Sequence, residues 1–298
     1  MVELAKGVFM MRCTKKAYAK INLTLDVVAR RADGYHDLKS VMQSVSLCDV
    51  LTFTRRENGF SMTSNGDLPC DERNLVFRAA KAYFAAAGHT FGVHVDLEKH
   101  IPMQAGLGGG SADAAATLCA LNEMDGERFD AQALCEIGAT IGADVPFCVR
   151  GGTAICQGIG ERITPVTSTL QAHVVIAMRG EGVRTPWAFA KLDEKYDTYA
   201  LVANEADARL ARVVEALERG DLFALNGAVY NRFEDVIEQA RPDVASLKRS
   251  LRERGATLAL MSGSGPAVFG LFAMEQAAND ARDALLEMGA VAYCCEVK

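Results

Sequence analysis

The stretch "IPMQAGLGGGSADAAATLCALN", residues 101–122, sets four glycines directly before a serine and an alanine-rich segment. Apolar alternation at Val93, Val95 and Leu97 predicts a strand just upstream, and the alanine-rich part predicts a helix downstream. A glycine loop between a strand and a helix lets an anion approach the unpaired amides of the first helical turn. The stretch therefore predicts a phosphate site, although its loop contains no lysine.

Two common phosphate-binding motifs do not match this loop. A P-loop closes its glycine run with Gly-Lys-Ser/Thr, whereas Gly110 is followed here by Ser111 and Ala112. A dinucleotide fingerprint needs a glycine where Ser111 stands and follows the first strand of a βαβ unit, but a long β-rich segment precedes this loop. A dinucleotide-dependent oxidoreductase is therefore a distant alternative. A flexible turn into an ordinary capped helix is the alternative without a ligand.

Composition and charge restrict the partners. The 298 residues are half hydrophobic, as in globular proteins, and their number predicts two domains, which we place at 1–165 and 166–298. A net charge of −6 argues against nucleic acid and anionic membranes and favours a small-molecule partner. The nine cysteines form no CxxC pair, so we expect reduced thiols in a cytoplasmic protein. Residues 1–10 are interpreted as an extension or an alternative translation start.

The N-terminal half alternates strand and helix patterns. Apolar alternation over 21–27 and 41–47, around the Asp33-Gly34 turn, predicts paired antiparallel strands. A helix is expected over 74–87, ended by Gly88, and another over 131–141. A short strand is expected over 153–156.

The C-terminal half also has both strand and helix patterns. Strands are expected over 174–178, 257–261, 267–272 and 291–297, and helices over about 199–218, 221–239, 242–254 and 276–288. The loop 262–266, "SGSGP", joins two apolar strands, which predicts a hairpin whose amides could also face an anion.

Phosphoryl transfer from a bound triphosphate would need a cation and a base for the acceptor. Lys20 opens a hydrophobic strand, so it is either that cation or an edge-strand lysine that hinders aggregation. Asp144 precedes Val145-Pro146, so it is either the base or a helix N-cap. Tyr35-His36 offers an aromatic face beside an imidazole, suited to a nucleobase, or else packs on the surface as a turn aromatic.

Four motifs stand in one order along the chain: "AYAKINLTL" with "RADGYHDL", then "PMQAGLGGGSAD", then "GADVPF" with "GGTAICQGIGE", then "MSGSGPAVFG". Together they resemble the GHMP kinase superfamily, and most closely its 4-diphosphocytidyl-2-C-methyl-D-erythritol kinases, over about residues 16–272. The "AKIN" and "RADGYH" pair separates this family from homoserine, mevalonate and galactose kinases. The resemblance implies an α+β fold of two domains, ribosomal-S5-domain-2-like and then ferredoxin-like, with the active site between them.

The resemblance also implies a reaction. The γ-phosphoryl group of ATP, with Mg²⁺, would move to the 2-hydroxyl of the cytidylated methylerythritol in the non-mevalonate isoprenoid pathway. Asp144 would be the base, and Lys20 would hold Asp144 and stabilise charge on the transferring group. Lys20 from the first predicted strand, together with Mg²⁺, would then supply the cation that the glycine loop lacks.

The implied binding residues fall into two sets. Asn74 and Lys99 would flank the adenosine, and Ser111 is a candidate metal contact. The triphosphate cradle would consist of Pro102, Met103, Gln104, Ala105, Gly106, Leu107, Gly108, Gly109, Gly110, Ser111 and Ala112. The substrate contacts would be Asn22, Tyr35, His36, Thr185 and Phe189, with cytosine between the rings of Tyr35 and Phe189 or, alternatively, stacked on Trp187.

Two other functions stay open at this point. A kinase for another alcohol, such as homoserine, would have no use for Tyr35-His36. A catalytically silent nucleotide-binding or regulatory protein would not need Lys20 and Asp144 together. We expect a monomer or a weak homodimer.

Overall fold

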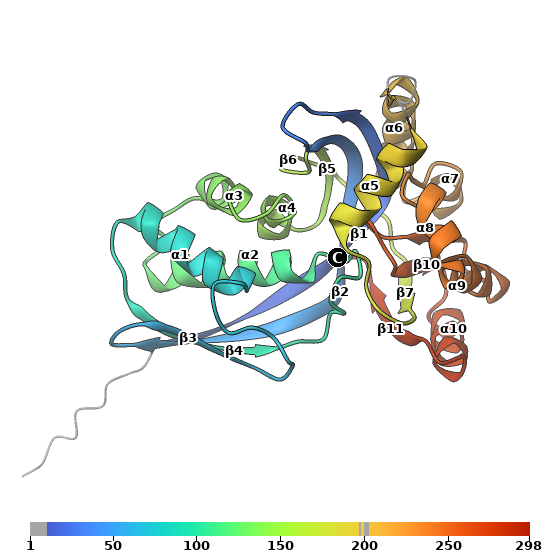
Figure 1. Cartoon of the computed structure of the whole chain (residues 1–298). Helices are drawn as coiled ribbons and strands as arrows, with labels where there is room; N and C mark the ends of the chain where they lie inside the picture. The colour runs from blue at the N-terminus through green and yellow to red at the C-terminus, as the bar shows by residue number, and fades with distance from the viewer. Residues whose placement is uncertain (1–10, 197, 200–202) are drawn as a thin grey trace, which may run out of the picture.

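The computed structural model describes residues 11–196, 198–199 and 203–298. In this part of the chain the strands form two sheets, shown side by side in Figure 1. The first sheet has the order β3-β4-β2-β1-β8, and β5 and β6 extend it from β2. Its strands are β1 (Arg12–Arg30), β2 (His36–Arg56), β3 (Phe60–Ser64), β4 (Gly92–Glu98), β5 (Thr153–Gly158), β6 (Arg162–Pro165) and β8 (Tyr230–Asn231).

The second sheet has the order β11-β7-β10-β9 and is antiparallel throughout. Its strands are β7 (His173–Met178), β9 (Leu258–Met261), β10 (Val268–Phe272) and β11 (Val291–Glu296). The proposed boundary near 165 falls between β6 and β7. Among the described residues, the two-residue β8 joins the first sheet from beyond it, and Val297 forms an isolated bridge with Val45 of β2.

Helices cover both sheets (Figure 1). The first sheet packs against α1 (Leu75–Ala87) and α2 (Gly109–Met124) through one apolar cluster, with α3 (Ala131–Ala139) and α4 (Val145–Arg150) beside α2. The second sheet packs against α9 (Pro242–Glu253) and α10 (Glu275–Glu287). The other C-terminal helices are α5 (Thr185–Lys195), α6 (Ala203–Arg219), α7 (Leu222–Asn226) and α8 (Glu234–Ala240).

Local sequence signals fix several of these elements as predicted. The strands around Asp33-Gly34 pair in antiparallel register as β1 and β2. Asn74 caps α1 by accepting a hydrogen bond from the Val76 amide at 3.0 Å. Gly88 ends α1 in the left-handed conformation, with φ of 74°, which glycine adopts without a steric cost.

Other elements differ from the predictions, mainly in the C-terminal half. The expected helix over 221–239 is instead α7, β8 and α8, because the Asn231 side chain donates to the carbonyls of Met261 and Gly263 and so ties β8 to the second sheet. α5, β3 and β6 were not predicted. The helix expected from about 199 begins at 203, and residues 200–202 lie outside the described residues, as do residues 1–10.

No helix among the described residues is long and apolar enough to cross a membrane.

Candidate active site

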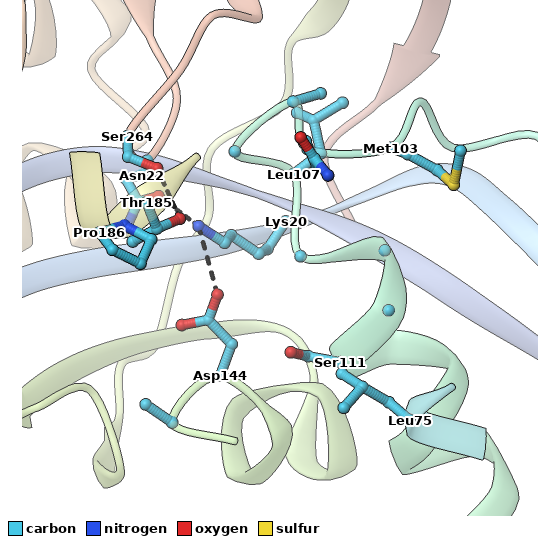
Figure 2. Close-up of a pocket in the computed structure, with 18 of the residues that line it drawn as sticks. Lys20, Asn22, Leu75, Met103, Leu107, Ser111, Asp144, Thr185, Pro186 and Ser264 are labelled. Carbon is cyan, nitrogen blue, oxygen red and sulfur yellow. Dashed lines mark hydrogen bonds and ion pairs between the residues drawn. The ribbon is translucent and has the colours of Figure 1, made fainter. Parts of the chain in front are cut away.

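A cavity of about 830 Å³ lies where the glycine loop meets β1, the start of α4 and the start of α5 (Figure 2). Nearly every residue of the predicted site lines it. The exception is Ala112, whose side chain is buried and whose amide donates to the Gly108 carbonyl within the first turn of α2. The structure thus gathers residues that lie more than 150 positions apart, from Lys20 to Phe189.

The glycine loop ends at the N-terminus of α2, where the first amides of a helix have no partner within the helix. Gly108 is the N-cap of α2 with φ of 69°, and Ser111 lies in the first turn rather than at the cap. A Cβ on Gly108 would lie 3.0 Å from Lys20 Cγ, so the missing side chain lets Lys20 run against the loop. The Lys20 amide also donates to the Leu107 carbonyl at 3.0 Å, which fastens the loop to β1.

The hairpin loop 262–266 contacts the glycine loop through hydrogen bonds. It joins β9 to β10, as predicted. The Ser262 hydroxyl donates to the Gly106 carbonyl at 2.9 Å, and the Ala267 amide donates to the Ala105 carbonyl at 3.1 Å. Gly106 has φ of 81°, and a Cβ there would lie only 2.1 Å from the Ser262 carbonyl oxygen. The two loops therefore meet backbone to backbone.

Lys20 and Asp144 face each other across the cavity (Figure 2). The Lys20 Nζ atom lies 2.7 Å from Asn22 Oδ1 and 3.6 Å from Asp144 Oδ2. Lys20 is only 4% exposed, which does not fit a lysine that shields a sheet edge. Asp144 occupies the N-cap position of α4, but its side chain makes no capping hydrogen bond in the described structure. The geometry therefore favours an ion pair between Lys20 and Asp144 over an edge-strand lysine and a capping aspartate.

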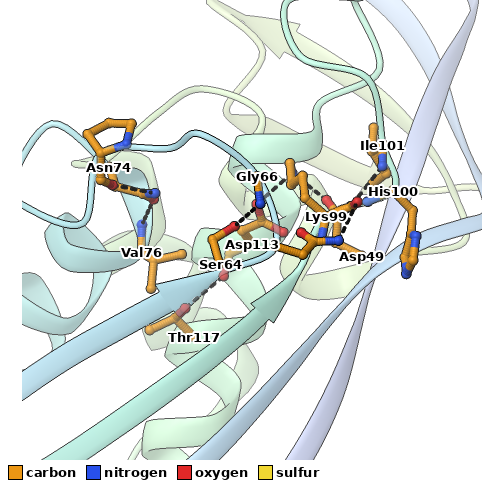
Figure 3. Close-up of polar contacts among 12 residues, drawn as sticks. Asp49, Ser64, Gly66, Asn74, Val76, Lys99, His100, Ile101, Asp113 and Thr117 are labelled. Carbon is orange, nitrogen blue, oxygen red and sulfur yellow. Dashed lines mark hydrogen bonds and ion pairs between the residues drawn. The ribbon is translucent and has the colours of Figure 1, made fainter.

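A second lysine lies under the loop, in a buried cluster with two carboxylates (Figure 3). The Lys99 ammonium contacts Asp49, and lies 2.6 Å from Asp113 Oδ2. Asp49 also accepts hydrogen bonds from the His100 and Ile101 amides at 2.6 and 2.8 Å. Because two carboxylates share one ammonium, Lys99 adds no net positive charge to the loop.

Asp113 is the unusual member of this cluster. Burial raises its pKa to about 7, against the opposing effect of Lys99. Its Oδ1 atom is buried with no hydrogen-bond partner among the described residues. Below that pKa the Asp113 carboxyl is protonated, which leaves a neutral Asp49–Lys99 pair beside it.

The far end of the cavity is aromatic. His36 stacks on Phe189, with ring centroids 4.5 Å apart and planes 16° from parallel. Tyr35 lines the same end and is 59% exposed, whereas Trp187 lies outside the described lining. His36 covers one face of Phe189, and the Phe233 ring also contacts Phe189, with centroids 4.9 Å apart and planes 82° apart. The cytosine sandwich between Tyr35 and Phe189 therefore stays a prediction.

Sequence reasoning missed several residues of this site. Asp113 stands two positions after Ser111 inside the quoted loop motif, but nothing in the motif shows that it meets Asp49 and Lys99. Asp193 contacts His36 from α5, the helix that was not predicted. Its spacing of four from Phe189 is a helical signal, but one that depends on recognising α5 first.

Comparison with known proteins shows the family to which the chain belongs. Residues 74–152 match the model for the GHMP kinases N terminal domain, and residues 213–291 match the model for the GHMP kinases C terminal. The 4-diphosphocytidyl-2-C-methyl-D-erythritol kinase of Pelotomaculum thermopropionicum is 43% identical over 265 residues, which is 88% of this chain and 90% of that protein. This chain belongs to that family of GHMP kinases. The corresponding kinase of Clostridium kluyveri is 38% identical over 258 residues, 86% of this chain and 90% of that protein.

A solved structure of the family shares the fold over nearly the whole chain. A crystal structure described as 4-(cytidine 5'-diphospho)-2C-methyl-D-erythritol kinase superposes with a TM-score of 0.79 at 34% identity, covering 96% of this chain and 99% of that one. A homoserine kinase from Cytophaga hutchinsonii reaches a TM-score of 0.75 at 19% identity, covering 99% and 96%, and shares the fold alone. The predicted two-domain α+β GHMP kinase fold is confirmed, and the oxidoreductase alternative is excluded.

Proposed function

We propose that this kinase transfers the γ-phosphoryl group of ATP to the 2-hydroxyl of 4-diphosphocytidyl-2-C-methyl-D-erythritol, in the non-mevalonate route to isoprenoid precursors. The observation that carries the proposal is the Lys20–Asp144 pair, with Nζ and Oδ2 3.6 Å apart, in one cavity with the glycine loop and the Tyr35-His36 end. Family membership supports the same substrate, since the relatives named above carry it in their names.

At the glycine-loop end of the cavity, backbone groups would bind the triphosphate. The amides at the start of α2, which the glycines leave accessible, would donate to the triphosphate where the helix dipole favours negative charge. Lys20 would add its ammonium to the transferring group, because Gly108 lets it lie against the loop. Asn74 and Lys99 would flank the adenosine, both from the cavity wall.

The acceptor end needs a base. The 2-hydroxyl belongs to a hindered tertiary alcohol, so a placed carboxylate that takes its proton during attack on the γ-phosphorus lowers the barrier. Asp144 would take that proton, and Lys20 would hold the carboxylate in place. The pair would thus link proton removal to charge stabilisation at the phosphoryl group.

Mg²⁺ fits the donors present, although the described residues include no cluster of three or more His, Cys, Asp or Glu that could hold a metal alone. Mg²⁺ is typically bound by substrate phosphates with one or two protein oxygens. Here the Ser111 hydroxyl, which lines the cavity, would be one such oxygen. When bound, the ion would neutralise phosphate charge.

Tyr35, His36 and Phe189 would hold the cytosine, and Asn22 and Thr185 would contact the rest of the substrate. Two hydrogen bonds hold the Asn22 side chain in position. Its side-chain nitrogen Nδ2 donates to the Ser40 hydroxyl at 2.9 Å, and its side-chain oxygen Oδ1 accepts from Lys20. We further propose a cytoplasmic enzyme, a monomer or weak homodimer, with domains at 1–165 and 166–298.

The test is ADP release with ATP and Mg²⁺ on four alcohols: the cytidylated methylerythritol, homoserine, mevalonate and galactose. Turnover confined to the first supports the proposal. Turnover of another alcohol would keep the kinase and overturn its substrate. Binding of ATP without turnover of any of the four would indicate a regulatory protein.

A further inference from the structure

The Lys20 ammonium lies beside the loop that joins β9 to β10. Gly263 of this loop lines the cavity together with Lys20. A Cβ added to Gly263 would lie 3.2 Å from Lys20 Nζ and 2.8 Å from the Gly106 carbonyl oxygen. Gly263 also has φ of 57°, in the left-handed region that favours glycine. The backbone of this loop therefore forms one wall of the space that the ammonium occupies.

Asn231 of β8 binds two carbonyl groups at the start of this loop. Its side-chain nitrogen Nδ2 donates to the Met261 carbonyl at 2.7 Å and to the Gly263 carbonyl at 2.8 Å. Its side-chain oxygen Oδ1 accepts from the Phe233 amide at 3.0 Å. The Asn231 side chain is fully buried and is not part of the cavity lining. Its hydrogen-bonding groups are thus used within the protein, so Asn231 does not act by touching a ligand.

The same strand that carries Lys20 also holds β8. Asn231 pairs with Leu25 of β1 in parallel register, and the Arg232 amide donates to the Leu25 carbonyl at 2.9 Å. β1 therefore carries the ammonium directly and, through β8, the side chain that binds the loop beside it. The position of the loop relative to Lys20 depends on the two hydrogen bonds from Asn231.

The groups around the Asn231 side chain require two donors and one acceptor. A carboxamide provides that set, whereas an ionised carboxylate of the same shape only accepts hydrogen bonds. Buried carbonyls that lose their donor and face a negative charge are costly to the folded state. Asn231→Asp should therefore release the Met261 and Gly263 carbonyls and let the loop move away from Lys20.

We propose that Asn231 is a positioning residue for phosphoryl transfer, which keeps the loop 262–266 against Lys20 and so fixes the ammonium beside the transferring group. The inference rests on the proposed function for the role of Lys20, but it does not depend on which alcohol is phosphorylated. Asn231 touches no reacting atom and acts through Gly263.

The kinetic test compares kcat and KM of wild type, Asn231→Asp and Leu285→Ala. For Asn231→Asp we expect kcat to fall about 10–100-fold, because displacing a catalytic group by about 1 Å can cost about 10²-fold in rate. KM for ATP and for the alcohol should stay within about threefold, because the Lys20 contact acts mainly in the transition state. Leu285 is buried in α10, outside the cavity lining, so Leu285→Ala should lose stability but keep kcat.

A second comparison separates positioning from general structural damage. Asn231→Asp is repeated in a Lys20→Met background, and ADP formation is measured in a single turnover with enzyme in excess. If Asn231 acts through Lys20, its replacement should lower the rate no further once the ammonium is gone. An equal loss in both backgrounds would overturn the inference, and so would a wild-type kcat in folded Asn231→Asp. If Asn231→Asp does not fold, Asn231→Ala, which removes the donors without adding a charge, replaces it with the same expected results.

The loop movement is also measurable without turnover. Backbone hydrogen exchange of residues 262–267, followed by mass spectrometry, should be faster in Asn231→Asp than in wild type and unchanged in Leu285→Ala. Unchanged exchange in the Asn231 variant would overturn the inference. Lack of wild-type turnover on every alcohol would instead refute the proposed function and leave the exchange measurement to decide whether Asn231 holds the loop.

Discussion

Replacing Gly106 by alanine tests the contact between the two loops that shape the phosphate site. The new Cβ would start 2.1 Å from the Ser262 carbonyl oxygen and 3.1 Å from the Gly265 amide nitrogen, so the loops must separate. Separation would break the Ser262–Gly106 and Ala267–Ala105 hydrogen bonds, each contributing about 1 kcal/mol. A φ of 81° adds about 1–2 kcal/mol of backbone strain for a residue with a Cβ.

The expected loss in the free energy of unfolding is therefore about 3–4 kcal/mol, measured by urea denaturation followed by circular dichroism. Gly289→Ala is the matched control, because Gly289 has φ of 77° but no described atom within 4 Å of its added Cβ. It should lose only about 1–2 kcal/mol, from backbone strain alone. Equal losses in the two variants would show that the loops do not touch at Gly106 and would refute the reasoning.

Three further predictions concern single side chains. Asp144→Asn should lower kcat about 10²–10⁴-fold while ATP affinity, measured by calorimetry, survives, because the base acts in the transition state; near-normal kcat would remove Asp144 from the mechanism. Tyr35→Ala should raise KM for the cytidylated substrate by an amount equivalent to about 1–3 kcal/mol of base stacking, whereas Trp187→Ala should not; the reverse pattern would move the stacking role to Trp187. Asp113 has a pKa of about 7 in the native state, above the ordinary 3.8, so the folded protein holds a proton that the unfolded chain has lost. The stability of the wild type relative to Asp113→Asn should therefore fall as pH rises from about 4 to about 7, and urea midpoints that differ by the same amount at both ends would contradict the raised pKa.

Local sequence signals predicted the elements whose ends depend on residues close by in the chain. Asn74 and Gly88 bound α1 by their own capping chemistry, and the glycine loop with its flanking strand and helix follows from spacing alone. The break between α7 and α8 could not be predicted, because it depends on Asn231 reaching carbonyls about thirty residues away. Tertiary contacts of that kind override local helical periodicity.

The candidate site also combines features that the sequence predicts with features that depend on tertiary contacts. The order of the motifs predicted which residues line the cavity. From the sequence alone, however, Lys20 could equally be an edge-strand lysine and Asp144 a helix N-cap. Burial and interatomic distance are needed to choose between these interpretations. Asp49 and Asp193 were missed because each contacts a predicted site residue, Lys99 or His36, that is distant in sequence. Such supporting contacts are set by the packing of separate elements, and no single stretch of sequence records them.

The most direct test of the central claim is ³¹P NMR of a reaction containing the enzyme, ATP, Mg²⁺ and 4-diphosphocytidyl-2-C-methyl-D-erythritol. The account predicts a new phosphomonoester signal that grows in step with ADP, while the diphosphate of the substrate stays intact. Retention of all ATP signals by folded, ATP-binding enzyme, or ADP formation with inorganic phosphate alone, would contradict it.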